Sequence, residues 1–342
     1  MYLKLLDEKP EELLLHQDKP FYVYLSLTNI CNANCIFCDV RSNEKKKCSI
    51  DVIKLIDELS DLGTQYIHFT GGGEPFINDE IFTYLEYATE KGLKINIISN
   101  GWNLDEKRIK KLSNYNIKSF FFSIDSHIPE VHDSIRRVDG LWNKVTTNIN
   151  LIKQYIPNVK IVLNHVLNKL NVDNFSDFIN LKKQFNFDFI NPIIIKDCDE
   201  LFFTKEQIEK YNKNLNYYYD LATELGIQFL SESIDYFNSN VSKYGDRYSN
   251  TDLKCIYPSF CSFIDAPTGF VYPCDCSIHR DKKIYKIGDL TNQSFSSIWN
   301  GTSRNLLKNS LLNSELNCKT KCDQANCDFN NCYFKIKERS RV

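Results

Sequence analysis

Three cysteines near the amino terminus constrain this chain more than any other feature. Cys31, Cys35 and Cys38 are spaced C-x3-C-x2-C directly after an apolar, strand-like run at 21–27. Structural zinc normally has four Cys or His ligands, and the nearest further candidate, Cys48, lies beyond a charged segment. Three thiolates suit an iron–sulfur cluster that leaves one iron free for another ligand. A zinc site completed by a distant ligand, or three unconnected cysteines, is the alternative.

Apolar periodicity after these cysteines alternates between strand and helix. Strands separated by helices imply right-handed crossovers and a parallel sheet. The six strand–helix units are fewer than the eight of a closed barrel, so we expect an α/β fold with a partial (β/α)6, TIM-like barrel. The expected strands are 21–27, 66–70, 93–98, 119–124, 159–167 and 187–195, and the expected helices are 49–62, 78–91, 105–112, 142–155, 173–185 and 204–225.

Polar turns follow three of the expected strands. They are the glycine-rich turn 70–75, the Ser99-Asn100 pair and the segment 123–126. Because the carboxyl ends of parallel strands share the edge where ligands bind, we expect these turns to form one site with the cysteines. Glycines at 71–73 would let the backbone approach a ligand closely. Taken singly, each of these features is better explained as turn glycines or a helix cap, whereas the three together favour a site.

The cysteine spacing, with the aromatic Phe37 before the last cysteine, resembles the signature of the radical S-adenosylmethionine (SAM) superfamily. The resemblance implies a [4Fe–4S] cluster held by Cys31, Cys35 and Cys38, with Phe37 beside the cofactor. The free iron would be chelated by the amino and carboxylate groups of SAM. One electron from the cluster would then cleave SAM to methionine and a 5′-deoxyadenosyl radical, which abstracts a substrate hydrogen.

The same resemblance assigns SAM contacts to the polar turns. The GGE-type element of the family holds the SAM amino group, which implies that role for Gly72, Gly73 and Glu74. Ser99 and Asn100 match a polar pair that lies against the methionine or ribose of SAM. These assignments remain expectations from the motif.

Two further motifs complete the expected SAM site. Ser123 and Asp125 match a strand-four motif that contacts the ribose and the carboxylate. The segment 132–136 resembles the family's HD-x-x-R element, whose arginine pairs with the SAM carboxylate. A guanidinium fork suits that task, and Arg136 aligns with the motif better than Arg137 does.

Other polar residues near the strands are less informative. Asn164 and Asn168, around the fifth strand, could line the adenosine side or could simply be polar residues at a strand end. His68 lies within the second strand, and we expect it to face the core or the barrel.

The second half of the chain is rich in cysteine. Eight of the 13 cysteines lie between residues 255 and 342, and alternating runs flank a Pro/Thr/Gly turn, which predicts a β-hairpin. This region resembles the SPASM/Twitch extension, which binds auxiliary [4Fe–4S] clusters. The hairpin match is Gly269-x4-Cys274, and 286–300 matches the segment between the cysteine groups. The expected ligands are Cys255, Cys261, Cys274, Cys276, Cys318, Cys322, Cys327 and Cys332.

The terminal cysteines depart from the usual SPASM spacing. The family has C-x2-C-x5-C-x3-C and a further cysteine, whereas here the gaps are 3, 4 and 4 residues. The resemblance implies a first set of Cys255, Cys261, Cys274 and Cys332, and leaves the fourth ligand of a second set open. One or two auxiliary clusters are therefore expected, with zinc ribbons as the alternative.

Composition limits which partners the protein can bind and in which cell compartment it can occur. With 42 Lys+Arg against 44 Asp+Glu, no net field favours nucleic acid, and no apolar run approaches a membrane span. The amino terminus lacks the apolar core of a signal peptide, so we expect a cytoplasmic protein in which cysteines bind metal more readily than they form disulfides. The expected domains are an extension (1–20), the barrel (21–200), a helical connector (201–254) and the SPASM-type domain (255–342).

These observations together predict a radical SAM enzyme that modifies a peptide or protein. Dehydrogenation of a sugar or aminocyclitol is the alternative reaction, and a non-catalytic iron–sulfur electron carrier is the alternative class. The expected partners are a peptide or small-molecule substrate and an electron donor such as flavodoxin or ferredoxin. Only about twenty residues precede the first strand, which is too few for the amino-terminal peptide-recognition domain that many peptide-modifying members of the family carry, so a separate recognition protein or a small-molecule substrate stays open. No catalytic acid or base is evident.

Overall fold

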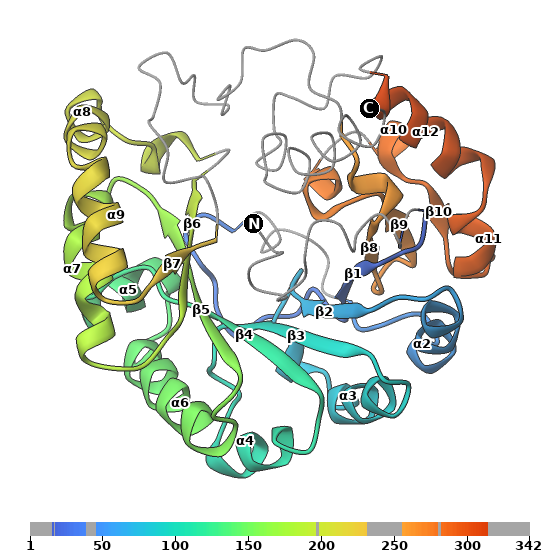
Figure 1. Ribbon diagram of the computed structural model, residues 1–342, viewed down its shortest axis with the longest axis horizontal. Helices are drawn as coiled ribbons and strands as arrows, with labels where there is room; N and C mark the ends of the chain where they lie inside the picture. The colour runs from blue at the N-terminus through green and yellow to red at the C-terminus, as the bar shows by residue number, and fades with distance from the viewer. Residues whose placement is uncertain are drawn as a thin grey trace, which may run out of the picture.

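The computed structural model describes residues 16, 18–38, 46–195, 198–230, 255–279 and 282–313. Within these residues ten strands form one sheet in the order β10-β9-β8-β1-β2-β3-β4-β5-β6-β7. The first six strands in the chain run parallel to their neighbours and form the curved wall of the barrel seen in Figure 1. They are β1 (Tyr22–Ser26), β2 (Tyr66–Thr70), β3 (Lys94–Ser99), β4 (Ile117–Ser123), β5 (Lys160–Leu167) and β6 (Phe189–Ile194). The predicted partial barrel is confirmed.

Helices cover the outer face of this wall (Figure 1). Alternation along β4 explains the layering, because Phe120 and Phe122 belong to the large core shared with the helices, whereas Phe121 packs in a separate cluster with Val162 and Phe189. The helices are α2 (Val52–Asp61), α3 (Ile81–Glu90), α4 (Glu106–Leu112), α5 (Pro129–Arg136), α6 (Leu141–Tyr155) and α7 (Phe175–Ile179).

Aspartate side chains cap the first turns of two outer helices. The Asp51 carboxylate accepts a hydrogen bond from Lys54 N (3.0 Å) at the start of α2, and Asp105 accepts one from Arg108 N (2.7 Å) at the start of α4. Each side chain satisfies an amide that the first helical turn leaves without a partner. No helix in the described ranges is long and apolar enough to cross a membrane.

Two predicted helices differ from the structure. The single helix expected over 204–225 is two, α8 (Lys205–Lys213) and α9 (Leu215–Glu224), which meet at Asn214. The helix expected over 173–185 is the short α7 between two 3-10 turns, Val172–Asn174 and Asn180–Lys183. The spacing of apolar residues does not predict such a break, because the buried residues on either side of it, such as Tyr211 and Tyr218, continue one helical pattern. Residues 231–254 of the helical connector expected over 201–254 lie outside the described residues.

The cysteine-rich half adds strands to the barrel sheet. Strand β8 (Cys261–Asp265) pairs with β1 in parallel, with Tyr22 opposite Cys261 and Ser26 opposite Asp265. Strands β9 (Phe270–Tyr272) and β10 (Gly288–Asp289) follow antiparallel, and the two-residue β7 (Gln228–Phe229) closes the other edge. The predicted hairpin is confirmed, and Gly269 supplies its left-handed turn with a φ of +75°.

Helices of the second half also fix the entry to β1. The indole N–H of Trp299, in α11 (Phe295–Trp299), donates to the carbonyl of Asp18 (2.8 Å). In α12 (Thr302–Leu312), the Arg304 guanidinium donates to the carbonyl of Pro258 (2.8 Å) and pairs with the Asp18 carboxylate (3.2 Å). The residues before β1 are therefore anchored by the carboxyl-terminal part of the described chain.

Candidate active site

The three amino-terminal cysteines lie in the loop after β1, against the end of α5. Cys35 is buried, and Cys31 and Cys38 are partly exposed. The last carbonyls of α5 accept hydrogen bonds from this loop: Arg136 O from Asn34 N (3.3 Å) and Ile135 O from Ile36 N (3.0 Å). Helix ends leave carbonyls without intrahelical partners, so the end of α5 both completes its own hydrogen bonding and holds the cysteine loop.

The glycine-rich turn after β2 packs directly on that loop. Glu74 N donates to Ile30 O (2.9 Å), and Gly72 N donates to Ser26 Oγ (2.8 Å). A Cβ on Gly73 would lie only 2.1 Å from Ile30 O, so any side chain there would displace the backbone that leads into Cys31. Gly73 is thus required by the close approach of two segments of this chain.

Glu74 joins two of the predicted turns. Its side chain is buried, with Oε1 accepting from Ser99 Oγ (2.7 Å) and Oε2 accepting from Asn100 N (2.8 Å). Burial raises the pKa of this carboxyl to about 7, and the donors around it oppose the rise. Asn100 continues the contact to the cysteine loop, since its Nδ2 donates to Asn32 Oδ1 (3.0 Å) and lies 3.7 Å from Cys31 Sγ.

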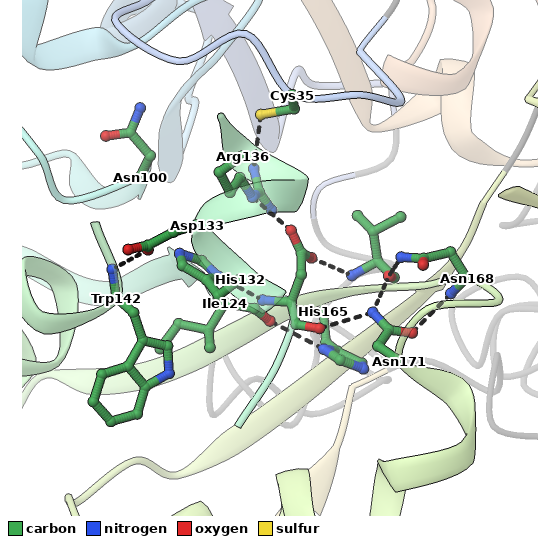
Figure 2. Close-up of polar contacts among 12 residues, drawn as sticks. Cys35, Asn100, Ile124, His132, Asp133, Arg136, Trp142, His165, Asn168 and Asn171 are labelled. Carbon is green, nitrogen blue, oxygen red and sulfur yellow. Dashed lines mark hydrogen bonds and ion pairs between the residues drawn. The ribbon is translucent and has the colours of Figure 1, made fainter. Parts of the chain in front are cut away.

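Arg136 and Asp125 form a buried ion pair at the other side of the loop. Arg136 Nε lies 2.5 Å from Asp125 Oδ2, and Asp125 Oδ1 accepts from Val166 N (2.9 Å). Arg136 Nη1 lies 3.7 Å from Cys35 Sγ, and the guanidinium carbon is 5.2 Å from the centre of the Phe37 ring. Figure 2 shows Arg136 between Cys35 and this carboxylate.

Neutral histidines support the backbone around Asp125. Asp125 N donates to His132 Nδ1 (3.1 Å), and His165 Nδ1 lies 3.0 Å from Ile124 O (Figure 2). Burial lowers the pKa of His132 to about 3 and that of His165 to about 4. Asn171 Nδ2 also donates to Asp125 O (2.8 Å). Sequence reasoning did not assign these three residues a role, although the HD-x-x-R resemblance already contained His132.

Asp133, the acidic residue of the HD-x-x-R motif, caps the next helix. Asp133 Oδ2 accepts from Gly140 N (2.7 Å), and Oδ1 accepts from Trp142 N (2.8 Å), at the first turn of α6. Figure 2 shows the contact with Trp142. The motif therefore orients α5 and α6 as well as presenting Arg136.

The remaining predicted polar residues, Ser123, Asn164 and Asn168, lie at the end of β4, within β5 and directly after β5. Ser123 is opposite Asn164, which is opposite Asn191, and Asn191 Nδ2 donates to Asn164 Oδ1 (2.9 Å). Asn168 Nδ2 donates to Val166 O (2.8 Å) and its Oδ1 accepts from Leu170 N (2.9 Å). Asn168 thus shapes the turn after β5.

Strands β8 and β9 bring two of the cysteines that were predicted to bind auxiliary clusters next to the barrel sheet. Cys261 begins β8, Cys274 follows β9, and both are buried, while Cys255 is partly exposed. The side chain of Cys276, and all of Cys318, Cys322, Cys327 and Cys332, lie outside the described residues.

The donor set of the first loop fits an iron–sulfur cluster. It offers three thiols from one loop, with a guanidinium N–H near Cys35 Sγ and an amide N–H near Cys31 Sγ. Burial raises the pKa of Cys31 to about 11 and also raises that of Cys35, so metal binding must displace thiol protons. In the described part of the chain, no three Cys, His, Asp or Glu side chains surround one point as ligands of a single metal ion do.

Comparisons with known proteins identify two domains in this chain. Residues 25–181 match the radical SAM superfamily, and residues 255–328 match the SPASM iron–sulfur cluster-binding domain. An AdoMet-dependent heme synthase of Methanosarcina barkeri is 22% identical over 82% of each chain. A cysteine-type anaerobic sulfatase-maturating enzyme of Clostridium novyi is 27% identical over 86% of this chain and 82% of its own.

A solved structure shows the same fold. Streptococcus suis SuiB bound to S-adenosylmethionine superposes with a TM-score of 0.66 at 14% identity, covering 87% of this chain and 70% of that one. Since both domain models match in the expected order, the chain is a radical SAM enzyme whose carboxyl-terminal SPASM domain binds auxiliary iron–sulfur clusters.

Proposed function

We propose that this radical SAM enzyme modifies a peptide or protein substrate. The observation that carries the proposal is the similarity to the C. novyi sulfatase-maturating enzyme, which extends over 82% of that protein and over both domains of this chain. The name of that relative describes an enzyme that acts on another protein. The M. barkeri heme synthase, matched over a similar share of its length, favours a small-molecule substrate as the second candidate.

The chain's own residues divide the work at the carboxyl edge of the barrel. When bound, the cluster and SAM supply one-electron cleavage of SAM and a 5′-deoxyadenosyl radical that removes a substrate hydrogen. Cys31, Cys35 and Cys38 would hold the cluster, and the backbone of Gly72 and Gly73 would face the SAM amino group.

The charged residues of the site would mainly hold other parts of the site in place. Glu74 is engaged by Ser99 and Asn100, so it would hold both turns in place around SAM. Ser123 and Asp125 would lie on the ribose side. Arg136 has five guanidinium N–H groups, of which the Nε and Nη1 contacts with Asp125 and Cys35 use two. The remaining N–H groups are available for the SAM carboxylate.

The electron for SAM cleavage must come from outside the chain, and a flavodoxin or ferredoxin would supply it.

For the second half we propose two auxiliary clusters, because four thiolates saturate a [4Fe–4S] cluster and eight cysteines lie between 255 and 332. After anaerobic reconstitution, a variant with Cys31, Cys35 and Cys38 all replaced by Ala should retain about eight irons per chain. About four would reduce the proposal to one auxiliary cluster.

Isotope transfer tests the substrate class. The reconstituted enzyme would be given dithionite, SAM and cysteine-containing peptides deuterated at the side-chain carbons, with deuterated sugars in parallel reactions. Because the radical takes hydrogen from its substrate, we expect deuterium in 5′-deoxyadenosine only with peptide, together with a mass change of the peptide. Transfer from the sugars alone, with the peptides unchanged, would contradict a peptide-modifying function.

A further inference from the structure

The end of α5 contacts the cysteine loop through a side chain as well as through its carbonyls. Arg136 Nη1 lies 3.7 Å from Cys35 Sγ, within hydrogen-bonding distance of a sulfur acceptor, and the arginine is only 8% exposed. The two carbonyl contacts, from Asn34 N and Ile36 N, bracket Cys35 in the sequence. Cys35 is therefore the cysteine of the loop that α5 holds most closely.

The direction of the guanidinium is fixed by residues on three other elements. Arg136 Nε bonds Asp125, which follows β4 and is fully buried, and Asp125 in turn accepts from Val166 N on β5. Phe37, in the cysteine loop itself, covers a face of the guanidinium. Figure 2 shows this chain of contacts running from Cys35 through Arg136 to the turn after β5. A guanidinium held in this way keeps one N–H on the sulfur.

The charges around Cys35 determine how that N–H would affect the reduction potential of a cluster. Asp125 balances the charge of Arg136, so the pair contributes little net charge at longer range. What remains at Cys35 is a short-range donor from a charged group, which is stronger than a neutral one. A hydrogen bond to a cluster sulfur favours the more negative, reduced state and so raises the reduction potential. Asn100 offers Cys31 Sγ a neutral donor at the same distance, 3.7 Å.

We propose that Arg136 is a positioning residue that raises the reduction potential of the cluster held by Cys31, Cys35 and Cys38, through the N–H that Asp125 fixes on Cys35 Sγ. This proposal rests on the proposed function, since it requires these cysteines to hold the cluster. The step concerned moves one electron from an external donor to the cluster. No bond is made or broken, and no proton is transferred.

Potentiometric titration without SAM tests the proposal. Anaerobically reconstituted full-length protein would be titrated with dithionite and mediators, and the reduced cluster followed by electron paramagnetic resonance. Its signal is identified as the one absent from the triple Cys31→Ala, Cys35→Ala, Cys38→Ala protein. Arg136→Gln removes the charged donor, whereas Arg137→Gln is a matched control because Arg137 is exposed and adjacent.

We expect the Arg136→Gln protein to be about tenfold harder to reduce, which corresponds to a potential lower by about 59 mV for a one-electron couple. Arg137→Gln should leave the potential unchanged. Arg136→Lys keeps the charge but cannot reach Asp125 and Cys35 with one planar fork, so its potential should also fall. The lysine variant provides the measurement if the glutamine variant loses its cluster.

Two outcomes separate the possible failures. An unchanged potential in an Arg136 variant that retains its iron would overturn the proposal while leaving the cluster assignment intact. The absence of any parental signal that depends on the three cysteines would instead overturn the proposed function. A SAM dissociation constant measured in parallel shows whether Arg136 also serves the SAM carboxylate, since that role alone would not move a potential measured without SAM.

Discussion

At the scale of single residues, hydrogen bonds among buried and partly buried polar groups connect the glycine-rich turn, the turn after β3 and the cysteine loop. Glu74 follows β2, Ser99 is the last residue of β3 and Asn100 comes directly after it, which suffices to place all three at one edge of the sheet. That Glu74 accepts hydrogen bonds from the other two depends on the loop paths between neighbouring strands, and these leave no periodic signal. Motif resemblance likewise did not reveal that Arg136 and Asp125 are each other's partners.

Gly73 gives a prediction at this scale. In Gly73→Ala the new methyl group would meet Ile30 O at 2.1 Å, so the backbone leading to Cys31 must move. We expect the iron bound at the first site to fall at least severalfold, because a cluster with only three protein ligands tolerates little displacement. Iron per chain after reconstitution, less the iron retained by the protein in which Cys31, Cys35 and Cys38 are all replaced by Ala, measures this.

Gly92→Ala is the control for that variant. Nothing lies within 4 Å of a Cβ at Gly92, although its φ of +76° strains any side chain. Its iron content should match the parent. Equal iron in the Gly73→Ala protein would show that the cysteine loop can shift without losing its ligand geometry.

At the scale of elements, strands were easier to predict than helices. Buried strands such as β2 are short apolar runs with clear ends, and the predicted range 66–70 agrees with the structure. Helix α5 was not predicted as a helix, because its eight residues are largely polar and were interpreted only as a motif. The break between α8 and α9 was not predicted, because the buried Tyr211 and Tyr218 lie on either side of it at the spacing of one continuous helix.

The link between α5 and α6 can be tested through Asp133. Asp133→Ala removes the acceptor for Gly140 N and Trp142 N, so amides at the start of α6 lose their partner. We expect the free energy of unfolding to fall by about 1–2 kcal/mol. Urea unfolding followed by circular dichroism measures it. Asp139→Ala, an exposed acid in the same connection, should change it by less than about 0.5 kcal/mol; similar losses in both variants would argue against a specific cap.

At the scale of the whole molecule, the main surprise is the continuity of the sheet. Sequence composition separates a barrel from a cysteine-rich region, yet β8 pairs with β1 along its full length, and Trp299 and Arg304 contact Asp18. Residues more than two hundred positions apart are neighbours here, and such pairing cannot be derived from local periodicity. The consequence is that Asp265 of β8 lies opposite Ser26, on the strand that leads to Cys31.

Buried histidines make the stability of the whole fold dependent on pH. Burial lowers the pKa of His68 and His132 to about 3 and that of His165 to about 4. Below pH 6.5 the unfolded chain binds protons that the folded chain does not, so stability is complete above that pH and is lost as the pH falls toward 4. At pH 5.5 each histidine should cost about 1.4 kcal/mol.

Urea unfolding at pH 7.5 and pH 5.5 checks this expectation. His68→Gln removes one titrating group, so the loss of stability between the two pH values should shrink by about 1.4 kcal/mol relative to the parent. A variant with the same pH dependence as the parent would mean that His68 becomes protonated within the folded state.

The most direct test of the central claim is SAM cleavage by a protein lacking one cysteine of the first loop. Cys35→Ala leaves two thiolates for a cluster that already has an open iron, whereas Cys48→Ala removes a cysteine whose Sγ contacts Ile50 O outside the loop (3.4 Å). With dithionite as reductant, 5′-deoxyadenosine formation should be abolished in Cys35→Ala and remain at the parental level in Cys48→Ala. Undiminished formation in the Cys35→Ala protein would contradict the assignment of Cys31, Cys35 and Cys38 as the ligands of the SAM-binding cluster.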